Sequence, residues 1–177
     1  MSGSIKLVIL DIDGVLTDGR KYYNEHGMPI MKTYCDKDFT AIKRLRGAGV
    51  NVCFLSGDDF VNKAMAKNRN IPFYSARGKD KADFLTEFQD RYDASLYEMA
   101  YIGDDLFDMS IMRAVGHPFC PSDACRDIKA TCPVENVLRR PGGCNVVAEM
   151  VDVMLDRKLV PDSTMEQIEA LDKNEKF

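Results

Sequence analysis

The feature that most restricts the fold of this chain is an alternation of short apolar runs with longer amphipathic segments. Apolar, β-prone runs occupy residues 5–10, 50–55, 71–74 and 99–102, and a weaker run covers 115–120. Apolar residues recur at helical spacing over 36–48, 58–69, 79–92, 105–114, 123–129 and 144–157. Strands that alternate with helices predict a mostly parallel sheet covered on both faces. We therefore expect an α/β fold, a Rossmann-like three-layer α/β/α arrangement, over one domain of residues 1–177.

Two segments fall outside this alternation. Residues 19–34 contain two short β-prone runs separated by turn residues, which predicts a β-hairpin inserted after the first strand. Residues 161–177 are polar apart from Met165, Ile168 and Leu171. This composition predicts either a short docked helix or a loose tail.

Polar side chains follow three of the apolar runs at the point where each run ends. Asp11 and Asp13 follow the first run, Ser56 follows the second, and Asp104 and Asp105 follow the run at 99–102. In open α/β sheets, ligands bind at the carboxyl ends of the strands. The sequence therefore predicts that these five side chains share one site.

The acidic residues of this predicted site suit phosphoryl transfer. One carboxylate, Asp11, can attack phosphorus, and a second, Asp13, can protonate the leaving oxygen and then deprotonate the attacking water. Two anions approach a phosphate only with a cation between them, and Asp11 with Asp104 would supply the carboxylates of a Mg²⁺ site. Taken alone, Asp-x-Asp-Gly also fits an ordinary acidic turn, and Asp104 and Asp105 also fit helix N-caps.

The phosphate itself needs hydrogen-bond donors and a cation. Ser56 and Gly57 offer a hydroxyl and a backbone N–H. Lys79 and Lys81 both lie at the start of the segment 79–92, and either could neutralise the phosphate while the other is a surface lysine. The roles of Asp105 and Asp108 stay open at this point.

Composition limits the possible partners. The net charge is -4 and the pI is about 5.2, whereas a nucleic-acid binder needs a basic surface, so we expect no nucleic-acid partner. The run at 5–10 is too short for a signal peptide or a membrane span, and no later run is longer, so we expect a soluble, cytoplasmic protein. The six cysteines lack the spacing of a zinc site, and we expect reduced, packed thiols.

The residues of the predicted phosphate site resemble, in type and order, the four motifs of the haloacid dehalogenase superfamily. They are Asp11 with Asp13, Ser56, Lys81 and Asp104. The resemblance implies that Asp11 is the nucleophile, Asp13 the acid/base and Ser56 the hydroxyl of the second motif. It also implies that Lys81 is the lysine of the third motif and that Asp104 binds the metal. By the same analogy, Mg²⁺ is held by Asp11, Asp104 and the backbone carbonyl of Asp13.

A closer resemblance covers about residues 5–155. The stretch 13–19 (DGVLTDG), the hairpin segment after it, the short chain and Gly142-Gly143 are similar to the 3-deoxy-manno-octulosonate 8-phosphate phosphatases and to relatives that act on nine-carbon sugar-acid phosphates. This implies a phosphorylated sugar acid as substrate and no large cap domain. It also implies a homotetramer in which the hairpin helps form the assembly and a neighbouring subunit closes the active site.

Two positions depart from the octulosonate pattern. Asp58 follows Ser56-Gly57 at a position where the octulosonate family typically has arginine and the nine-carbon relatives carry an acid. Ala148 stands where an arginine is frequent. An anionic sugar still needs a cation, for which Lys67 (or Lys63 or Arg69) and Arg140 (or Arg139) are candidates. The residues we expect to bind substrate are therefore Gly57, Asp58, Lys67, Arg140, Gly142 and Gly143.

Two other functions compete with this one. The chain could hydrolyse another sugar phosphate or a nucleotide. It could also be a non-catalytic assembly domain, like the C-terminal domain of some sialate cytidylyltransferases. That second alternative predicts loss of the catalytic positions, and all of them are present in this sequence.

Overall fold

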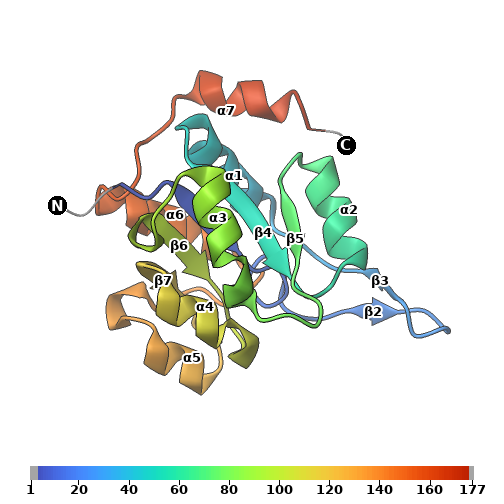
Figure 1. Cartoon of the computed structure of the whole chain (residues 1–177). Coiled ribbons are helices and arrows are strands. Elements are labelled where there is room, and N and C mark those ends of the chain that lie inside the picture. The colour runs from blue at the N-terminus through green and yellow to red at the C-terminus, as the bar shows by residue number, and fades with distance from the viewer. Residues whose placement is uncertain (1–3, 176–177) are drawn as a thin grey trace.

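The computed structural model describes residues 4–175, which form three layers around a parallel sheet (Figure 1). The five strands of this sheet pair in the order β5-β4-β1-β6-β7, and every pairing is parallel. The strands are β1 (Leu7–Leu10), β4 (Asn51–Ser56), β5 (Phe73–Ser75), β6 (Met99–Ile102) and β7 (His117–Phe119). The predicted α/β class and parallel sheet are confirmed.

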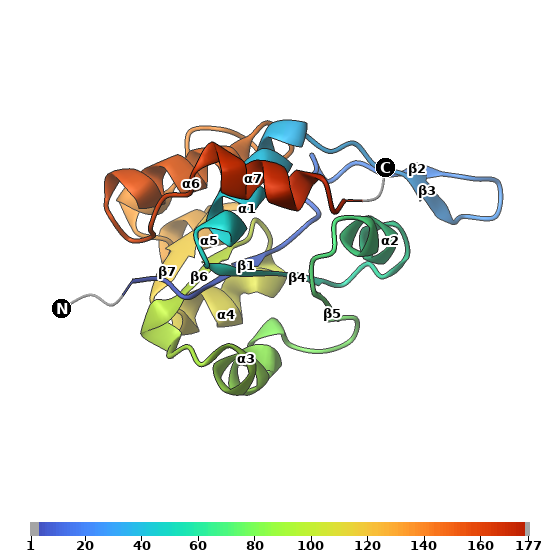
Figure 2. The same cartoon turned by 90° about the horizontal axis from the view of Figure 1, so that it is seen from above.

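Helices cover both faces of this sheet, and Figure 2 shows α1 and α6 on one side with α3 and α4 on the other. The first face carries α1 (Asp36–Gly47), α2 (Phe60–Asn68) and α6 (Val146–Asp156). The second face carries α3 (Leu85–Tyr92), α4 (Met109–Ala114) and α5 (Arg126–Thr131). Short 3-10 helices are η1 (Lys81–Phe84), η2 (Leu96–Glu98), η3 (Leu106–Asp108) and η4 (Val134–Asn136). Because both faces are covered, all four residues of β1 are buried.

Several element boundaries differ from the sequence prediction. The strand expected over 71–74 begins at Phe73, after Pro72, which has no N–H to donate to the ladder. Pro118 does lie inside a strand, because β7 is an edge strand of the sheet. The helix expected over 79–92 starts as the 3-10 turn η1, whose N-cap Asp80 accepts a hydrogen bond from the N–H of Ala82 (2.8 Å).

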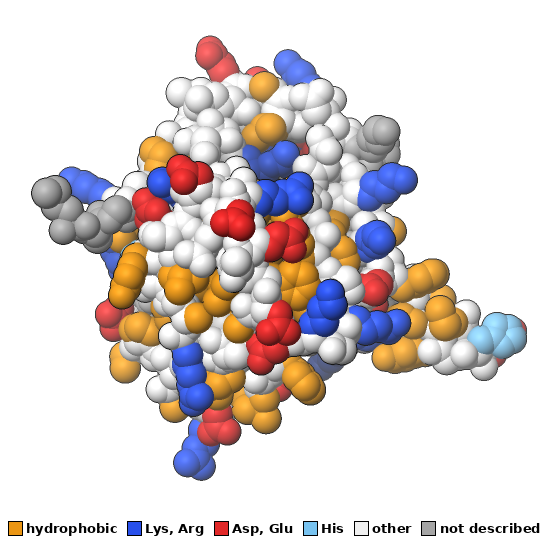
Figure 3. Space-filling model, viewed as in Figure 1, with side chains coloured by type: hydrophobic (Ala, Val, Ile, Leu, Met, Phe, Trp, Pro, Cys, Tyr) orange, Lys and Arg blue, Asp and Glu red, His pale blue; other side chains and the backbone are white. Residues whose placement is uncertain are grey.

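The segment between β1 and α1 forms the predicted hairpin. Its strands β2 (Tyr22–Tyr23) and β3 (Pro29–Met31) pair antiparallel and project from the body of the domain (Figure 1). Figure 3 shows hydrophobic side chains gathered over this projection. The hairpin therefore exposes a set of large apolar side chains.

Two forms were expected for residues 161–177, a short docked helix or a loose tail, and the structure shows the docked helix. Helix α7 (Met165–Asp172) packs on α1, where Lys43 pairs with Asp172 and with Glu175 (3.0 Å). Residues 176–177 of the predicted tail lie outside the described residues. Within 4–175, no helix combines the length and the apolar character that a membrane crossing requires. All six cysteines are free thiols; Cys53, Cys120 and Cys132 are buried, whereas Cys35 and Cys125 are half-buried and Cys144 is exposed.

Asp38 is a buried acid that joins two helices on the first face. Its Oδ1 accepts a hydrogen bond from the N–H of Ala148 (2.8 Å) in the first turn of α6, and its Oδ2 has no hydrogen-bond partner among the described residues. Burial raises the pKa of Asp38 to about 6, against the lowering by the N–H groups of Ala148 and Val147 and by Arg140. The folded protein therefore holds this proton more tightly than the unfolded chain does.

We expect Asp38→Asn to flatten part of the pH dependence of stability. Because the pKa of Asp38 is higher in the folded than in the unfolded protein, its protonated form stabilises the fold. This contribution to the free energy of unfolding is fully present below about pH 4 and is lost as the pH rises through about 6. An asparagine does not titrate, so its contribution to the free energy of unfolding stays constant over that pH range. The free energy of unfolding of the variant, relative to the wild type, should therefore rise by about 2 kcal/mol between pH 4.5 and 7.5 in urea titrations. A difference that stays constant with pH would contradict this account.

Candidate active site

A cavity of about 1080 Å³ opens at the carboxyl edge of the sheet. Asp11 and Asp13 follow β1, Ser56 ends β4, Asp104 follows β6, and Lys81 enters from η1; all five line this cavity. The strands β4, β1 and β6 are neighbours, so their carboxyl ends lie side by side. The structure thus brings the predicted catalytic residues together.

Asp11 is held between a backbone donor and a buried lysine. Its side chain is 9% exposed; Oδ1 accepts from the N–H of Ile12 (2.8 Å), and Oδ2 lies 2.9 Å from Nζ of Lys81. Lys81 also donates to Oδ1 of Asp108 (2.5 Å). Burial works to lower the pKa of Lys81, but Asp11 and Asp108 outweigh it and raise that pKa above its ordinary value. Lys81 is therefore a permanent cation beside Asp11.

Three carboxylates of the cavity form a candidate cation site. Asp11, Asp104 and Asp108 each offer an oxygen, and these oxygens lie within 4.8 Å of one another. Oδ1 of Asp104 is buried without a hydrogen-bond partner among the described residues. Burial, then the charges of Asp11 and Asp108, raise the pKa of Asp104 to about 8. Burial also raises the pKa of Asp11 despite the opposing Lys81. A divalent cation would offset this repulsion, and a hard cation such as Mg²⁺ prefers such oxygens.

Asp108 supports this site from behind, which answers a question that the sequence left open. Its Oδ1 accepts from Lys81 and from the hydroxyl of Tyr101, and its Oδ2 accepts from the N–H groups of Asp104 (2.9 Å) and Asp105 (3.0 Å). With both oxygens already bonded, Asp108 fixes the turn that presents Asp104. Asp105 caps η3 by accepting from the following N–H.

Glycines let the loop after β1 pack tightly against its neighbours. At Gly14, with φ +81°, a Cβ would lie 2.0 Å from Oδ2 of Asp104. At Gly142, a Cβ would lie 2.0 Å from the carbonyl oxygen of Gly14. Gly143 donates to the carbonyl of Val15 (2.8 Å). Gly142 and Gly143, which we expected to bind substrate, instead pack behind this loop and are not among the described residues that line the cavity.

The other predicted substrate contacts divide into two groups. Gly57 and Asp58 line the cavity. Lys67 is exposed on α2 and Arg140 is exposed before the double glycine, and neither is among the lining residues within 4–175. Arg69, an alternative to Lys67, is the C-cap residue of α2 and lies over the Phe39 ring (3.8 Å to its centre). Spacing along the sequence did not show which way these helix residues face.

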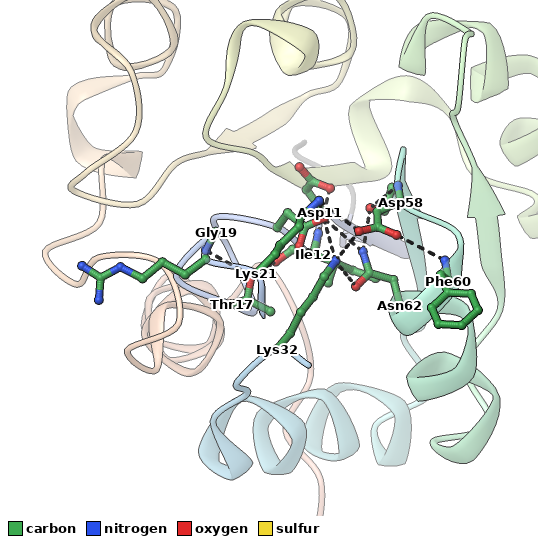
Figure 4. A network of polar contacts seen from close by, with 12 residues as sticks. Asp11, Ile12, Thr17, Gly19, Lys21, Lys32, Asp58, Phe60 and Asn62 are labelled. Atoms are coloured by element: carbon green, nitrogen blue, oxygen red, sulfur yellow. Dashed lines mark hydrogen bonds and ion pairs between the residues drawn. The ribbon is translucent and has the colours of Figure 1, made fainter. Parts of the chain in front are cut away.

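Sequence reasoning missed the lysines at the base of the hairpin. Lys21 and Lys32 reach into the same polar cluster as Asp58 and Asn62, beside Asp11 (Figure 4). Their one signal in the sequence was that each lies next to a β-prone run of the predicted hairpin. Arg77 and Lys79 add exposed cations to the cavity wall.

Comparisons with known proteins agree with this geometry. No protein-family model matches the chain. Over 153 residues it is 33% identical to the 3-deoxy-D-manno-octulosonate 8-phosphate phosphatase KdsC of Haemophilus influenzae, covering 86% of this chain and 83% of the relative. The cobalt-bound deoxy-D-mannose-octulosonate 8-phosphate phosphatase of H. influenzae matches with a TM-score of 0.79 and 31% identity over 88% of this chain and 90% of that one.

A second solved structure carries ligands. It is the 3-deoxy-D-manno-octulosonate 8-phosphate phosphatase of Moraxella catarrhalis in complex with a magnesium ion, a phosphate ion and a KDO molecule. It matches with a TM-score of 0.79 and 25% identity, covering 96% of this chain and 92% of that one. The likeness therefore extends over nearly the whole fold.

Proposed function

Because the chain belongs to the 3-deoxy-D-manno-octulosonate 8-phosphate phosphatase family of the haloacid dehalogenase superfamily, and is therefore a phosphatase, we propose that it hydrolyses the phosphate monoester of a small sugar acid with Mg²⁺, through an aspartyl-phosphate on Asp11. The observation that carries the proposal is the placement of Asp11, which lies 2.9 Å from Lys81 and within a carboxylate cluster. That cluster includes Asp104, whose buried Oδ1 has no hydrogen-bond partner among residues 4–175.

The reaction takes two steps on this chain's own residues. First, an oxygen of Asp11 bonds to phosphorus as the bond from phosphorus to the sugar oxygen breaks, and Asp13 gives its proton to that leaving oxygen. Second, Asp13 takes a proton from a water whose oxygen attacks the phosphorus, and Asp11 leaves as a carboxylate. The products are the free sugar acid and inorganic phosphate.

The remaining groups bind the phosphate. Oγ of Ser56 accepts a hydrogen bond from Nδ2 of Asn62 (3.0 Å), so its own proton is free to reach a phosphate oxygen. Lys81 supplies positive charge, and Gly57, which lines the cavity, offers its N–H as a further donor. Asp11, Asp104 and the backbone carbonyl of Asp13 would hold Mg²⁺. When bound, the ion lowers the repulsion between the phosphate and these carboxylates.

The sugar acid brings a further negative charge, and three cations of the cavity wall can meet it. Lys21, Arg77 and Lys79 line the cavity, whereas Lys67 and Arg140 do not. We therefore assign the substrate carboxylate to the first group. Asp58 accepts from Lys21 (2.9 Å) and Lys32 (2.8 Å), so the acid at this position is already paired within the protein.

The test of this proposal is phosphate release from a panel of phosphorylated sugars, sugar acids and nucleotides. We expect eight- or nine-carbon sugar-acid phosphates to give the highest kcat/KM, because their carboxylate meets the cations of the wall. EDTA should stop turnover, and added Mg²⁺ should restore it. As a reading independent of activity, Mg²⁺ should raise the Tm of the wild type more than that of Asp104→Asn.

Three results would contradict the proposal in part or as a whole. Turnover that EDTA does not reduce would contradict the proposed requirement for Mg²⁺. A higher kcat/KM for nucleotides than for every sugar acid would contradict the proposed substrate class but not the proposed phosphatase reaction. The absence of turnover on the whole panel would favour a non-catalytic assembly domain.

We also propose that the hairpin joins copies of this chain into a homotetramer. Its large apolar side chains are between 45% and 59% exposed, and they are Tyr22, Tyr23, Met28, Ile30 and Met31. An apolar patch of this kind is typical of an interface (Figure 3). Because the hairpin also lines the cavity through Tyr23 and Met28, a neighbour seated on it would help to close the active site.

Light scattering should therefore give the mass of a tetramer. Ile30→Lys places a charge in the middle of the hairpin patch and should shift the protein toward smaller species. The matched control is Met165→Lys, which places the same charge on an exposed apolar residue of α7, far from the hairpin. A wild type that runs as a clean monomer would overturn the proposed assembly.

A further inference from the structure

We infer that Lys32 is a positioning residue for Asp13: it holds the acid/base carboxylate in place, and Asp58 and Asn62 hold Lys32. This inference rests on the proposed function, because it concerns the group that transfers the proton. It assigns a role to a lysine that no part of the mechanism above uses.

The ammonium of Lys32 is completely enclosed. Its side chain is 0% exposed. Nζ lies 2.7 and 3.0 Å from the two oxygens of Asp13, 2.8 Å from Oδ2 of Asp58 and 2.8 Å from Oδ1 of Asn62. A buried ammonium is tolerated only when its donors are paired, and here the three donors face oxygens of three residues. These oxygens come from the loop after β1, the loop after β4 and helix α2.

Asn62 links the same acid to the hydroxyl that faces the phosphate. It is fully buried, and its Nδ2 donates to Oδ2 of Asp13 (3.2 Å) and to Oγ of Ser56 (3.0 Å). Its Oδ1 accepts from Lys32 and from the hydroxyl of Tyr34 (3.1 Å). The amide is therefore fixed in one orientation by its four bonds. Together Lys32 and Asn62 turn the Asp13 carboxylate toward the hairpin side of the cavity, separate from the cluster of Asp11, Asp104 and Asp108.

The charges explain why an acid occupies position 58. Lys21 and Lys32 lie at the base of the hairpin, one residue beyond the Tyr22–Met31 pair on each strand. Like charges facing each other across strands are unfavourable. Asp58 accepts from both lysines and compensates them, whereas an arginine there would add a third cation. Asp58 therefore belongs to the support of Asp13 rather than to substrate binding.

Lys21 offers a matched comparison within the same cluster. It contacts the same two acids, at 3.4 Å from Asp13 and 2.9 Å from Asp58, but its side chain is 25% exposed and lines the cavity. Lys32 cannot reach a substrate, so its effect must pass through Asp13. Lys21 can touch the substrate directly.

The test measures the first turnover of Lys32→Met on p-nitrophenyl phosphate and on phenyl phosphate, with phenol release followed by rapid quench. p-Nitrophenolate leaves without a proton, whereas the more basic phenolate needs one from Asp13. We expect the rate for phenyl phosphate to fall at least about tenfold further than the rate for p-nitrophenyl phosphate, since general acid catalysis contributes about 10²–10⁴-fold. Lys21→Met should shift the ratio of the two rates far less than Lys32→Met does, because Lys21 lies 3.4 Å from Asp13, is partly exposed, and leaves both bonds from Lys32 to Asp13 in place.

Should Lys32→Met fail to fold by circular dichroism, Asp58→Asn gives the second reading. It keeps the shape of the side chain, weakens the hold on Lys32, and should shift the ratio of the two rates in the same direction. Equal slowing of both substrates in a folded variant would overturn the role of Lys32. A wild type that releases neither phenol, and releases no phosphate from any member of the sugar and nucleotide panel, would instead overturn the proposed function, so the two failures are distinguishable.

Discussion

Asp11→Asn is expected to abolish phosphate release, with kcat at least about 10⁴-fold lower, because loss of a residue that acts directly in catalysis has effects of this size. An amide does not attack phosphorus as a carboxylate does. The substitution keeps the shape of a side chain that accepts from Ile12 and lies 2.9 Å from Lys81. It also relieves the repulsion among Asp11, Asp104 and Asp108, and Lys81 keeps Asp108 as its partner, so we expect the melting temperature without Mg²⁺ to equal or exceed that of the wild type.

The matched control for this prediction is Asp105→Asn. Asp105 lines the same cavity, but it is exposed and caps η3 through an oxygen that asparagine also offers. Its kcat should stay within a few-fold of the wild type. Turnover retained by Asp11→Asn in the same assay would remove the nucleophile assignment, whatever the control shows.

Gly142→Ala is expected to have the second largest effect, although Gly142 does not line the cavity. Its Cβ would lie 2.0 Å from the carbonyl oxygen of Gly14 and 2.5 Å from its carbonyl carbon, which are backbone atoms that cannot rotate away. The loop after β1 must shift, and with it Asp13 and the contact between Gly14 and Asp104. We expect kcat to fall about 100-fold, because a shift near 1 Å costs about that much, and the free energy of unfolding to fall by about 1–3 kcal/mol.

Gly49→Ala separates this clash from ordinary loss of glycine. Gly49 has φ +85° after α1, and a Cβ there would meet nothing within 4 Å. Its substitution should destabilise the protein by about 1–2 kcal/mol and leave kcat unchanged. Urea unfolding and phosphate release on both variants check the comparison. If Gly142→Ala keeps the wild-type kcat, the double glycine does not set the position of the catalytic loop.

The polar residues of the candidate active site were predictable because their positions follow from strand ends alone. Apolar runs of strand length identified β1, β4 and β6, and adjacent parallel strands bring the residues that follow them to one edge. Asp11, Ser56 and Asp104 therefore needed no knowledge of side-chain packing. The spacing alone left Lys79 and Lys81 as alternatives, since both lie at the start of the same segment. The fold separates the two: Lys81 is buried against Asp11, while Lys79 is exposed at the cavity wall.

The hairpin cluster could not be predicted in the same way. Lys32 meets Asp13, Asp58 and Asn62 at separations of 19, 26 and 30 residues. Such contacts depend on the angle at which the hairpin leaves the sheet, which no periodicity records. For the same reason the sequence did not show that Lys67 and Arg140, the basic residues expected to meet the substrate, lie outside the set of residues that line the cavity.

The sequence by itself determined the parallel sheet, the polar residues that follow its strands and the acids that would act on a phosphate. Each of these depends only on local pattern and on the rule that the carboxyl ends of parallel strands meet at one edge. Only the tertiary structure decided how those acids are held. Asp108 fixes the turn of Asp104, the double glycine supports the loop of Asp13, and a buried lysine from the hairpin orients its carboxylate. These contacts join elements distant in sequence, and their specificity comes from packing and paired buried charge.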